Sequence, residues 1–209
     1  MVCLVDDEAV VRDALTGLLR SRRLLRTGFA SADAVEVWGA EPGAPGRAAW
    51  PTSPACLVLD KRMPGACGLV LFERLIERAL LPLMRVIFLT GHGDVPTAVV
   101  AVERGAFDFV EKRFSNNALV DRIGQALAAS GMAVAERGRR REQARALAEL
   151  TEREREVMAR VIEGRPNKLI ADALDIRVRT VEVHRARVFE KMNLKSAVDP
   201  ANPLLEAGA

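Results

Sequence analysis

The sequence predicts an α/β domain built on a five-stranded, doubly wound parallel sheet, followed by a small all-α domain that contains a helix-turn-helix unit. In residues 1–129, short apolar runs alternate five times with longer stretches of helical periodicity, which is the pattern of βα units. From Leu150 onward the periodicity is helical only. A chain of 209 residues accommodates two modest domains. We therefore expect domains at 1–129 and 150–209, joined by a helical connector at 130–149.

Each βα unit pairs an apolar run with an amphipathic stretch. The expected strands are 2–5, 24–29, 56–59, 85–89 and 107–110. The expected helices are 10–19, a short one after Ser31, 69–79, 95–104 and 116–129. Between the second and third units, residues 39–54 are rich in Gly, Pro and Ala and predict a surface excursion.

The C-terminal part shows start and stop signals for three helices. Thr151 and Glu154 form a predicted capping box, and Gly164 suits a left-handed helix end. Asn167 is the expected cap of a short helix, and a longer helix follows over about 178–193. A short helix, a tight turn and a longer helix are typical of DNA-binding helix-turn-helix units.

Five polar residues follow or end apolar runs of the predicted sheet: Asp6, Asp7, Asp60, Thr90 and Lys112. Residues just past the carboxyl ends of parallel strands share one crevice. Three carboxylates, a hydroxyl and an ammonium would then meet there. Carboxylates are ligands for Mg²⁺, and the ammonium and hydroxyl can bind phosphoryl oxygens. The pattern predicts a site for a divalent cation and a phosphoryl group.

Simpler interpretations exist for most of these residues. The Asp6-Asp7 pair suits the start of a helix, Thr90 stands in a glycine-rich turn, and Lys112 is compatible with a solvated surface position. Asp60 is better specified because it ends an apolar strand and precedes Arg62-Met63-Pro64-Gly65. A carboxylate with a cation beside it is a nucleophile for phosphorus.

Composition and charge indicate the kind of partner and the cellular compartment. The net charge of +3 lies entirely in residues 130–209, and segment 164–195 alone carries +4, which favours a nucleic-acid partner. No apolar run is long enough to span a membrane, and no signal peptide is expected. Three cysteines without ligand spacing favour a reducing, cytoplasmic setting. The Arg-rich connector 130–149 is expected to be a solvated helix, with a basic DNA-contacting arm as the alternative.

The strand-end residues, in this order and spacing, resemble the receiver domain of two-component response regulators. Residues 150–158, 164–171 and 180–186 resemble a LuxR-type DNA-binding domain, and the whole chain is similar to FixJ-type transcriptional regulators. The resemblance implies a sensor histidine kinase, double-stranded DNA promoter sites and a phosphorylation-dependent homodimer as partners. It implies no enzyme activity beyond phosphorylation and dephosphorylation of the chain's own aspartate.

The resemblance also implies roles for individual residues. Asp60 would be the phosphoacceptor, and Mg²⁺ would be bound by Asp7, Asp60 and the carbonyl of Arg62, with Asp6 acting through water. Thr90 and Lys112 would hold the phosphoryl oxygens, and Phe109 would be the aromatic switch. On DNA, the candidates for phosphate contacts are Lys168, Arg179, Thr180, Arg187 and Lys191. The candidates near base edges are Glu182, Val183 and Arg185.

Two departures from the family pattern stand out. Arg113 follows Lys112 where proline is usual, so we predict a trans peptide there, because a non-proline cis bond costs about 2.5–4 kcal/mol. Arg177 replaces the usual capping Ser or Thr before the last long helix, a loss of about 1 kcal/mol.

Two other functions share features of this pattern. An aspartyl-phosphatase would need a second carboxylate two residues after its nucleophile, and position 62 is arginine. A regulator that works without phosphorylation and uses the receiver only for dimerisation is the remaining alternative. The complete set of strand-end carboxylates, hydroxyl and ammonium argues against it, whereas the missing proline favours it.

Overall fold

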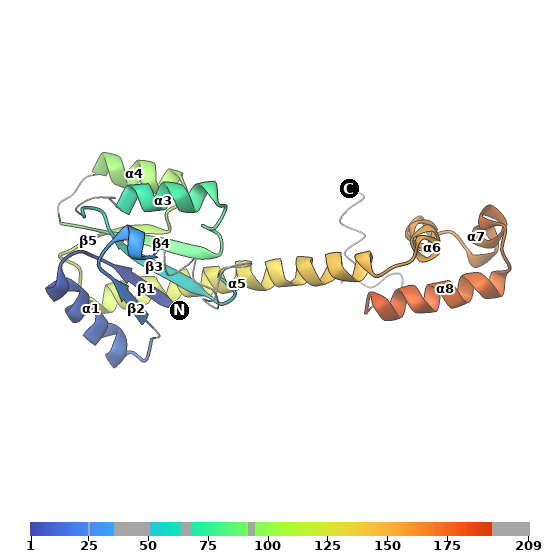
Figure 1. Cartoon of the computed structure of the whole chain (residues 1–209), viewed down its shortest axis with the longest axis horizontal. Helices are drawn as coiled ribbons and strands as arrows, with labels where there is room; N and C mark the ends of the chain where they lie inside the picture. The colour runs from blue at the N-terminus through green and yellow to red at the C-terminus, as the bar shows by residue number, and fades with distance from the viewer. Residues whose placement is uncertain (25, 36–50, 64–67, 92–94, 194–209) are drawn as a thin grey trace. The chain divides into compact units, whose positions relative to one another are not determined.

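The computed structural model of the chain describes residues 1–24, 26–35, 51–63, 68–91 and 95–193. The chain divides into two compact units, Met1–Glu136 and Arg137–Ala209. The first unit contains a five-stranded parallel sheet with helices, and the described part of the second contains helices only (Figure 1). Both predicted fold classes are confirmed.

The sheet follows the doubly wound order β2-β1-β3-β4-β5, with all neighbouring strands parallel. Its central strands β1 and β3 are buried along their whole length, because helices cover both of their faces. All five strands lie within two residues of the predicted ranges. Their bounds are β1 Val2–Val5, β2 Arg26–Phe29, β3 Ala55–Asp60, β4 Met84–Thr90 and β5 Asp108–Glu111.

Two pairs of helices cover the sheet (Figure 1). On one face, α1 (Ala9–Ser21) and α5 (Asn116–Ala148) bury apolar side chains such as Leu19 and Ile123. On the other face, α3 (Gly68–Glu77) and α4 (Val95–Glu103) do the same with residues such as Phe72 and Ala101, joined by Ala32 and Val35. The predicted excursion 39–54 lies mostly outside the described residues. Among the described helices, none is long and apolar enough to cross a membrane.

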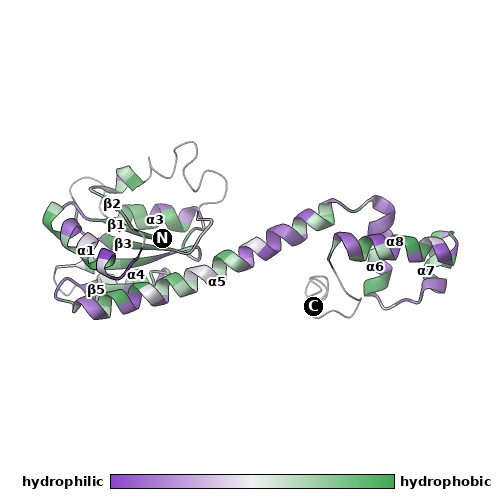
Figure 2. Cartoon of the chain, turned by 90° about the horizontal axis from the view of Figure 1, so that it is seen from below, coloured by the Kyte–Doolittle hydropathy of each residue, from purple (hydrophilic) through white to green (hydrophobic). Residues whose placement is uncertain are grey.

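Helix α5 continues far beyond the predicted range 116–129 and includes nearly all of the connector. Its first half buries Leu119, Ile123, Ala126 and Ser130. The Ser130 hydroxyl accepts a hydrogen bond from the amide of Ala55 at 2.8 Å and donates one to the carbonyl of Leu83. Much of the later part of the helix is hydrophilic (Figure 2). Residues 130–148 are therefore helical, as predicted.

The second unit contains the predicted helix-turn-helix. Helices α6 (Glu152–Ile162), α7 (Asn167–Leu174) and α8 (Val178–Lys191) surround a small core. That core consists of Val157, Ile170, Ala171, Leu174 and Val181. Asp175, between α7 and α8, has a φ of 50°, which lets the chain reverse in a tight turn.

The cap predictions had mixed outcomes. The capping box of Thr151 and Glu154 is present, and Gly164 has a φ of 72° at the end of α6. The prediction for Asn167 was wrong: Pro166 occupies the cap position, and Asn167 is the first helical residue. Its side-chain oxygen accepts a hydrogen bond from Arg185 at 2.6 Å, because α8 packs against α7 and brings the guanidinium there.

Glu154 has a second role beyond the capping box. Its carboxylate is almost completely buried and lies 2.7 Å from Nζ of Lys191 at the end of α8. Hydrogen bonds from Lys191 and from the backbone of Thr151 lower the pKa of Glu154 to about 2. Lys191 Nζ also donates to the carbonyl of Glu149 at 3.1 Å. One ammonium therefore joins the end of α8 to the start of α6.

We expect Lys191→Met to raise the pKa of Glu154 from about 2 toward its ordinary value of 4.5. Because the buried carboxylate then loses its charged donor, the free energy of unfolding of this unit should fall by about 1–3 kcal/mol at pH 7. Because the folded pKa is depressed, this stabilisation exists above pH 4.5 and disappears as the pH falls through about 2.

Carboxylate titration by ¹³C NMR and urea unfolding at several pH values test this prediction. Lys168→Met, which changes an exposed lysine of α7, is the matched control and should leave both quantities unchanged. Equal effects of the two substitutions would contradict the role of Lys191.

Candidate functional site

Four strand ends place the predicted polar residues at one edge of the sheet. Asp6 directly follows β1, Asp60 and Thr90 are the last residues of β3 and β4, and Lys112 directly follows β5. The register of the parallel pairs sets these ends beside one another. Strands β1 and β3 lie where the strand order reverses, which is the place where ligands bind in open α/β sheets.

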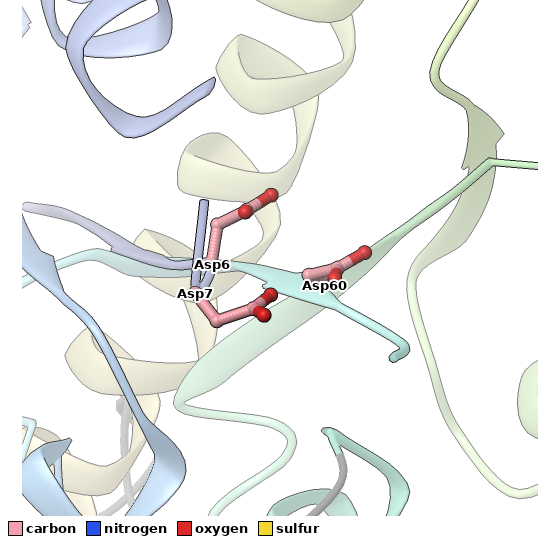
Figure 3. A group of neighbouring side chains, drawn as sticks. All are labelled: Asp6, Asp7 and Asp60. Atoms are coloured by element: carbon pink, nitrogen blue, oxygen red, sulfur yellow. The ribbon is translucent and has the colours of Figure 1, made fainter. Parts of the chain in front are cut away.

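Three carboxylates meet at this edge (Figure 3). One oxygen of each of Asp6, Asp7 and Asp60 lies within 4.8 Å of the others. Asp6 and Asp60 are buried, and Oδ1 of Asp7 is buried without a hydrogen-bond partner among the described residues. A cluster of hard oxygen ligands with an unsatisfied member fits a divalent cation such as Mg²⁺.

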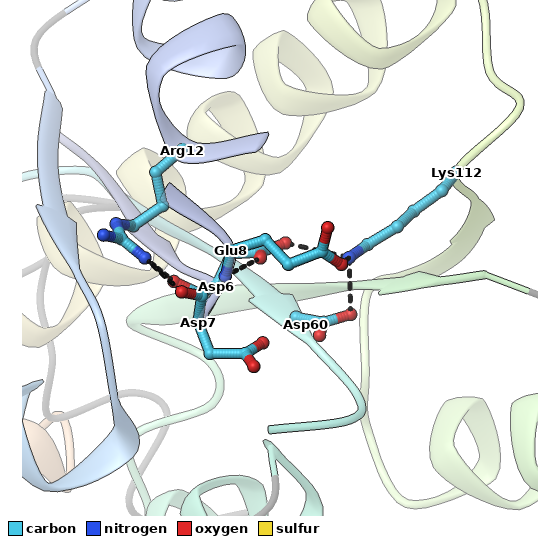
Figure 4. A network of polar contacts seen from close by, with 6 residues as sticks. All are labelled: Asp6, Asp7, Glu8, Arg12, Asp60 and Lys112. Carbon is cyan, nitrogen blue, oxygen red and sulfur yellow. Dashed lines mark hydrogen bonds and ion pairs between the residues drawn. The ribbon is translucent and has the colours of Figure 1, made fainter. Parts of the chain in front are cut away.

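Lys112 lies among these carboxylates (Figure 4). Its Nζ is 3.0 Å from Oδ2 of Asp6, 3.2 Å from Oδ1 of Asp60 and 3.7 Å from Oε1 of Glu8. Its backbone amide donates to the carbonyl of Thr90 at 2.6 Å, which extends the ladder between β4 and β5. The interpretation of Lys112 as a solvated surface residue is therefore wrong.

Burial and charge act in opposite directions in this cluster. Burial raises the pKa of Asp60, the ammonium of Lys112 lowers it, and the carboxylates of Asp6 and Asp7 raise it, so that the net direction is upward. Burial disfavours the ammonium of Lys112, but the contacts with Asp6 and Asp60 outweigh burial and raise its pKa. Three carboxylates and one ammonium leave an excess of negative charge that attracts a cation.

Arg12, which the sequence analysis missed, holds the Asp6-Asp7 segment in place. Its Nη1 donates to the backbone carbonyls of Asp6 at 2.6 Å and Asp7 at 2.8 Å (Figure 4). The amide of Glu8 donates to Oδ1 of Asp6 at 2.9 Å. The available signal was an arginine in the first turn of the helix that follows the acidic pair, a position from which its side chain can reach back to that pair.

The remaining predicted residues occupy positions of three kinds. Thr90 is buried at the end of β4. Phe109 is half-buried, with its ring centroid 5.8 Å from that of Phe88 in the sheet core. Arg62 is an exposed residue shortly after β3.

Gly68 is a second residue that the sequence analysis missed. A Cβ atom at this position would lie 2.2 Å from the carbonyl oxygen of Asp60 and 3.0 Å from Cγ of Leu59. The first residue of α3 therefore rests directly on the backbone of Asp60, and a side chain there would displace it. The glycine follows Asp60 by eight residues, and only the tertiary contact reveals why it is needed.

The eight predicted DNA contacts fall into two groups. The first group lies on α7 and α8 and includes the half-buried Thr180. Its other five members are exposed: Lys168, Arg179, Glu182, Val183 and Arg187. Two have partners within the unit. Arg185 donates to Asn167 and lies 5.6 Å from the ring centroid of Phe189, and Lys191 is paired with Glu154.

Comparisons with known proteins agree with this arrangement. The model of the response regulator receiver domain matches residues 2–124. The model of bacterial regulatory proteins of the luxR family matches residues 148–202. The chain belongs to the response regulators. It combines a receiver domain with a LuxR-type regulatory domain.

Several relatives resemble this response regulator over nearly its whole length. The C4-dicarboxylate transport transcriptional regulatory protein DctR of Rhodobacter capsulatus is 45% identical over 96% of this chain and 96% of its own. The transcriptional regulatory protein FixJ of Azorhizobium caulinodans is 39% identical over 99% of this chain and 92% of its own. The structure of response regulator StyR matches with a TM-score of 0.82 at 34% identity, over 98% of this chain and 96% of its own.

We expect Gly68→Ala to lower the free energy of unfolding of the receiver by about 1–3 kcal/mol, because the added methyl group forces the backbone of α3 or of Asp60 to move. Gly124→Ala in α5 is the matched control, since nothing lies within 4 Å of its Cβ position. Because Gly124 lies in an exposed helix interior, this control should raise the free energy of unfolding of the receiver by about 0.5–1 kcal/mol. Urea unfolding measures both, and effects of the same sign would contradict the contact.

Proposed function

We propose that this response regulator is a DNA-binding transcriptional regulator of a two-component phosphorelay, activated when a sensor histidine kinase phosphorylates Asp60. One observation carries the proposal. The Asp60 carboxylate ends β3 within 4.8 Å of two further carboxylates and 3.2 Å from an ammonium, which is a charge arrangement suited to accepting a phosphoryl group.

In the transfer, a carboxylate oxygen of Asp60 attacks the phosphorus of a phosphohistidine on the kinase. The new O–P bond forms as the P–N bond breaks, and the electron pair returns to the imidazole ring, which takes up a proton. The raised pKa keeps Lys112 charged at neutral pH, so that its ammonium holds a phosphoryl oxygen. The hydroxyl of Thr90 holds another.

Mg²⁺ fits the acidic cluster, and Asp7, Asp60 and the carbonyl of Arg62 would bind it directly, with Asp6 acting through water. Oδ1 of Asp7, which is buried and has no hydrogen-bond partner within the described part of the chain, supports this assignment. When bound, the cation offsets the negative charge that the phosphoryl group adds to the carboxylates. Lys112 alone cannot do so, because its single charge already faces Asp6, Glu8 and Asp60.

The acyl phosphate would draw Thr90 inward and let Phe109 repack from its place beside Phe88, which changes the surface of α4, β5 and α5. Two receivers would then pair, and the homodimer would present two DNA-binding domains to paired half-sites in promoters, in the cytoplasm. We infer domain boundaries at 1–129 and 150–209, with the connector 130–149 between them.

On DNA, the exposed residues of α7 and α8 are the proposed contacts. Lys168, Arg179, Thr180 and Arg187 would bind phosphates, and Glu182 and Val183 would face base edges. Arg185 could reach a base only by exchanging its bond to Asn167. We assign Lys191 to the support of Glu154 rather than to phosphate.

Treatment of the chain with acetyl phosphate and Mg²⁺ tests the phosphoacceptor directly. We expect mass spectrometry to find one added phosphoryl group in the wild type and none in Asp60→Asn. Asp33→Asn, an exposed carboxylate outside the crevice, is the matched control and should be labelled like the wild type. Equal labelling of Asp60→Asn would contradict the assignment, and an unlabelled wild type would favour the phosphorylation-independent alternative.

A further inference from the structure

The second half of α5 holds the densest positive charge of the chain's C-terminal unit. Residues 137–145 contain five arginines and one glutamate, a net charge of +4 in nine positions. By comparison, residues 150–193 contain ten basic and eight acidic side chains, a net charge of +2. This part of α5 is strongly hydrophilic (Figure 2). Four of the five arginines are exposed: Arg139, Arg140, Arg141 and Arg145.

The compact unit that contains the helix-turn-helix begins at Arg137. The arginine segment therefore belongs to that unit. Just after the segment, Ala146 and Leu147 pack against a cluster of Leu150, Val188 and Met192. Two hydrogen bonds reinforce this junction: Lys191 donates to the carbonyl of Glu149 at 3.1 Å, and Arg155 donates to that of Ala148 at 3.3 Å. The segment is thus fixed to the C-terminal end of α8.

Helix α8 itself offers little net charge to a DNA duplex. Arg185 is bonded to Asn167, and Lys191 is paired with Glu154. The exposed charged residues of α8 are two cations and two anions, which cancel: Arg179, Arg187, Glu182 and Glu190. Because non-specific DNA affinity comes almost wholly from cations that displace counterions, the unit needs positive charge from outside α8.

We propose that the arginine segment 137–145 binds phosphates of the DNA duplex next to the site that α8 reads. This inference rests on the proposed DNA-binding function and adds a second contact surface to it. Arg137, Arg141 and Arg145 recur every four residues, about 6 Å apart along one side of the helix. Guanidinium groups bind phosphate in a bidentate manner.

The ion pair at the end of the segment does not oppose this role. Arg145 and Glu149 are 3.5 Å apart, with 84% and 57% of their side chains exposed. Such solvent-exposed pairs contribute little to stability, so that Arg145 can exchange its partner for a phosphate. An acidic surface on a second copy of the chain is the other possible occupant, but the attached helix-turn-helix brings DNA to this unit.

The test uses the full chain and a fluorescent random-sequence duplex of about 40 base pairs, because backbone contacts do not need the operator sequence. Anisotropy titrations at several salt concentrations compare the wild type with the triple variant Arg137→Gln, Arg141→Gln, Arg145→Gln. Each lost phosphate contact lowers the slope of log K against log salt by about 0.9, so we expect a reduction of about 2–3. Glutamine preserves helix propensity, which circular dichroism verifies.

A triple variant of the receiver, Arg20→Gln, Arg22→Gln, Arg23→Gln, makes the same change in net charge and should keep the wild-type slope. An unchanged slope in the arginine-segment variant would overturn the inference. If Arg179→Ala weakens binding while the segment variant does not, the proposed function stands and the inference fails. A wild type that binds no DNA would contradict both. Altered sedimentation of the segment variant alone, without a change in slope, would assign the segment to protein contact and also overturn the proposal.

Discussion

The ammonium of Lys112, held between Asp6 and Asp60, is the interaction on which the site depends. Three carboxylates with oxygens within 4.8 Å of one another repel, and the ammonium of Lys112, in contact with two of them, offsets part of that repulsion. The contact exists only if β1, β3 and β5 end at the same edge, with β4 in register between β3 and β5. The contact of Lys112 with the two carboxylates therefore requires the buried parallel sheet.

Secondary contacts keep this arrangement in place. Arg12 binds the two carbonyls that precede α1, and Gly68 lets α3 begin directly against the carbonyl of Asp60. Neither residue needs to touch a phosphoryl group or a cation. Each fixes the backbone that carries a carboxylate, so that the three acidic side chains keep their spacing despite their mutual repulsion.

The sequence was sufficient for the parts of the site that depend on local pattern. Asp60 and Thr90 end apolar strands, and the capping box of Thr151 and Glu154 is a local motif, so both could be predicted. The rest depends on contacts between residues distant in sequence. The bond from Arg185 to Asn167 and the pair of Lys191 with Glu154 form only when α8 packs against α7 and α6, which no periodicity reveals.

The central claim is that the strand-end carboxylates form a cation site, and thermal unfolding as a function of Mg²⁺ concentration measures it most directly. Binding to the folded state alone stabilises by RT ln(1 + [L]/Kd), about 2.7 kcal/mol at one hundred times Kd. We predict that Mg²⁺ raises the unfolding temperature of the wild type and of Asp13→Asn, an exposed carboxylate of α1, but not that of Asp7→Asn. An equal rise in Asp7→Asn would contradict the account.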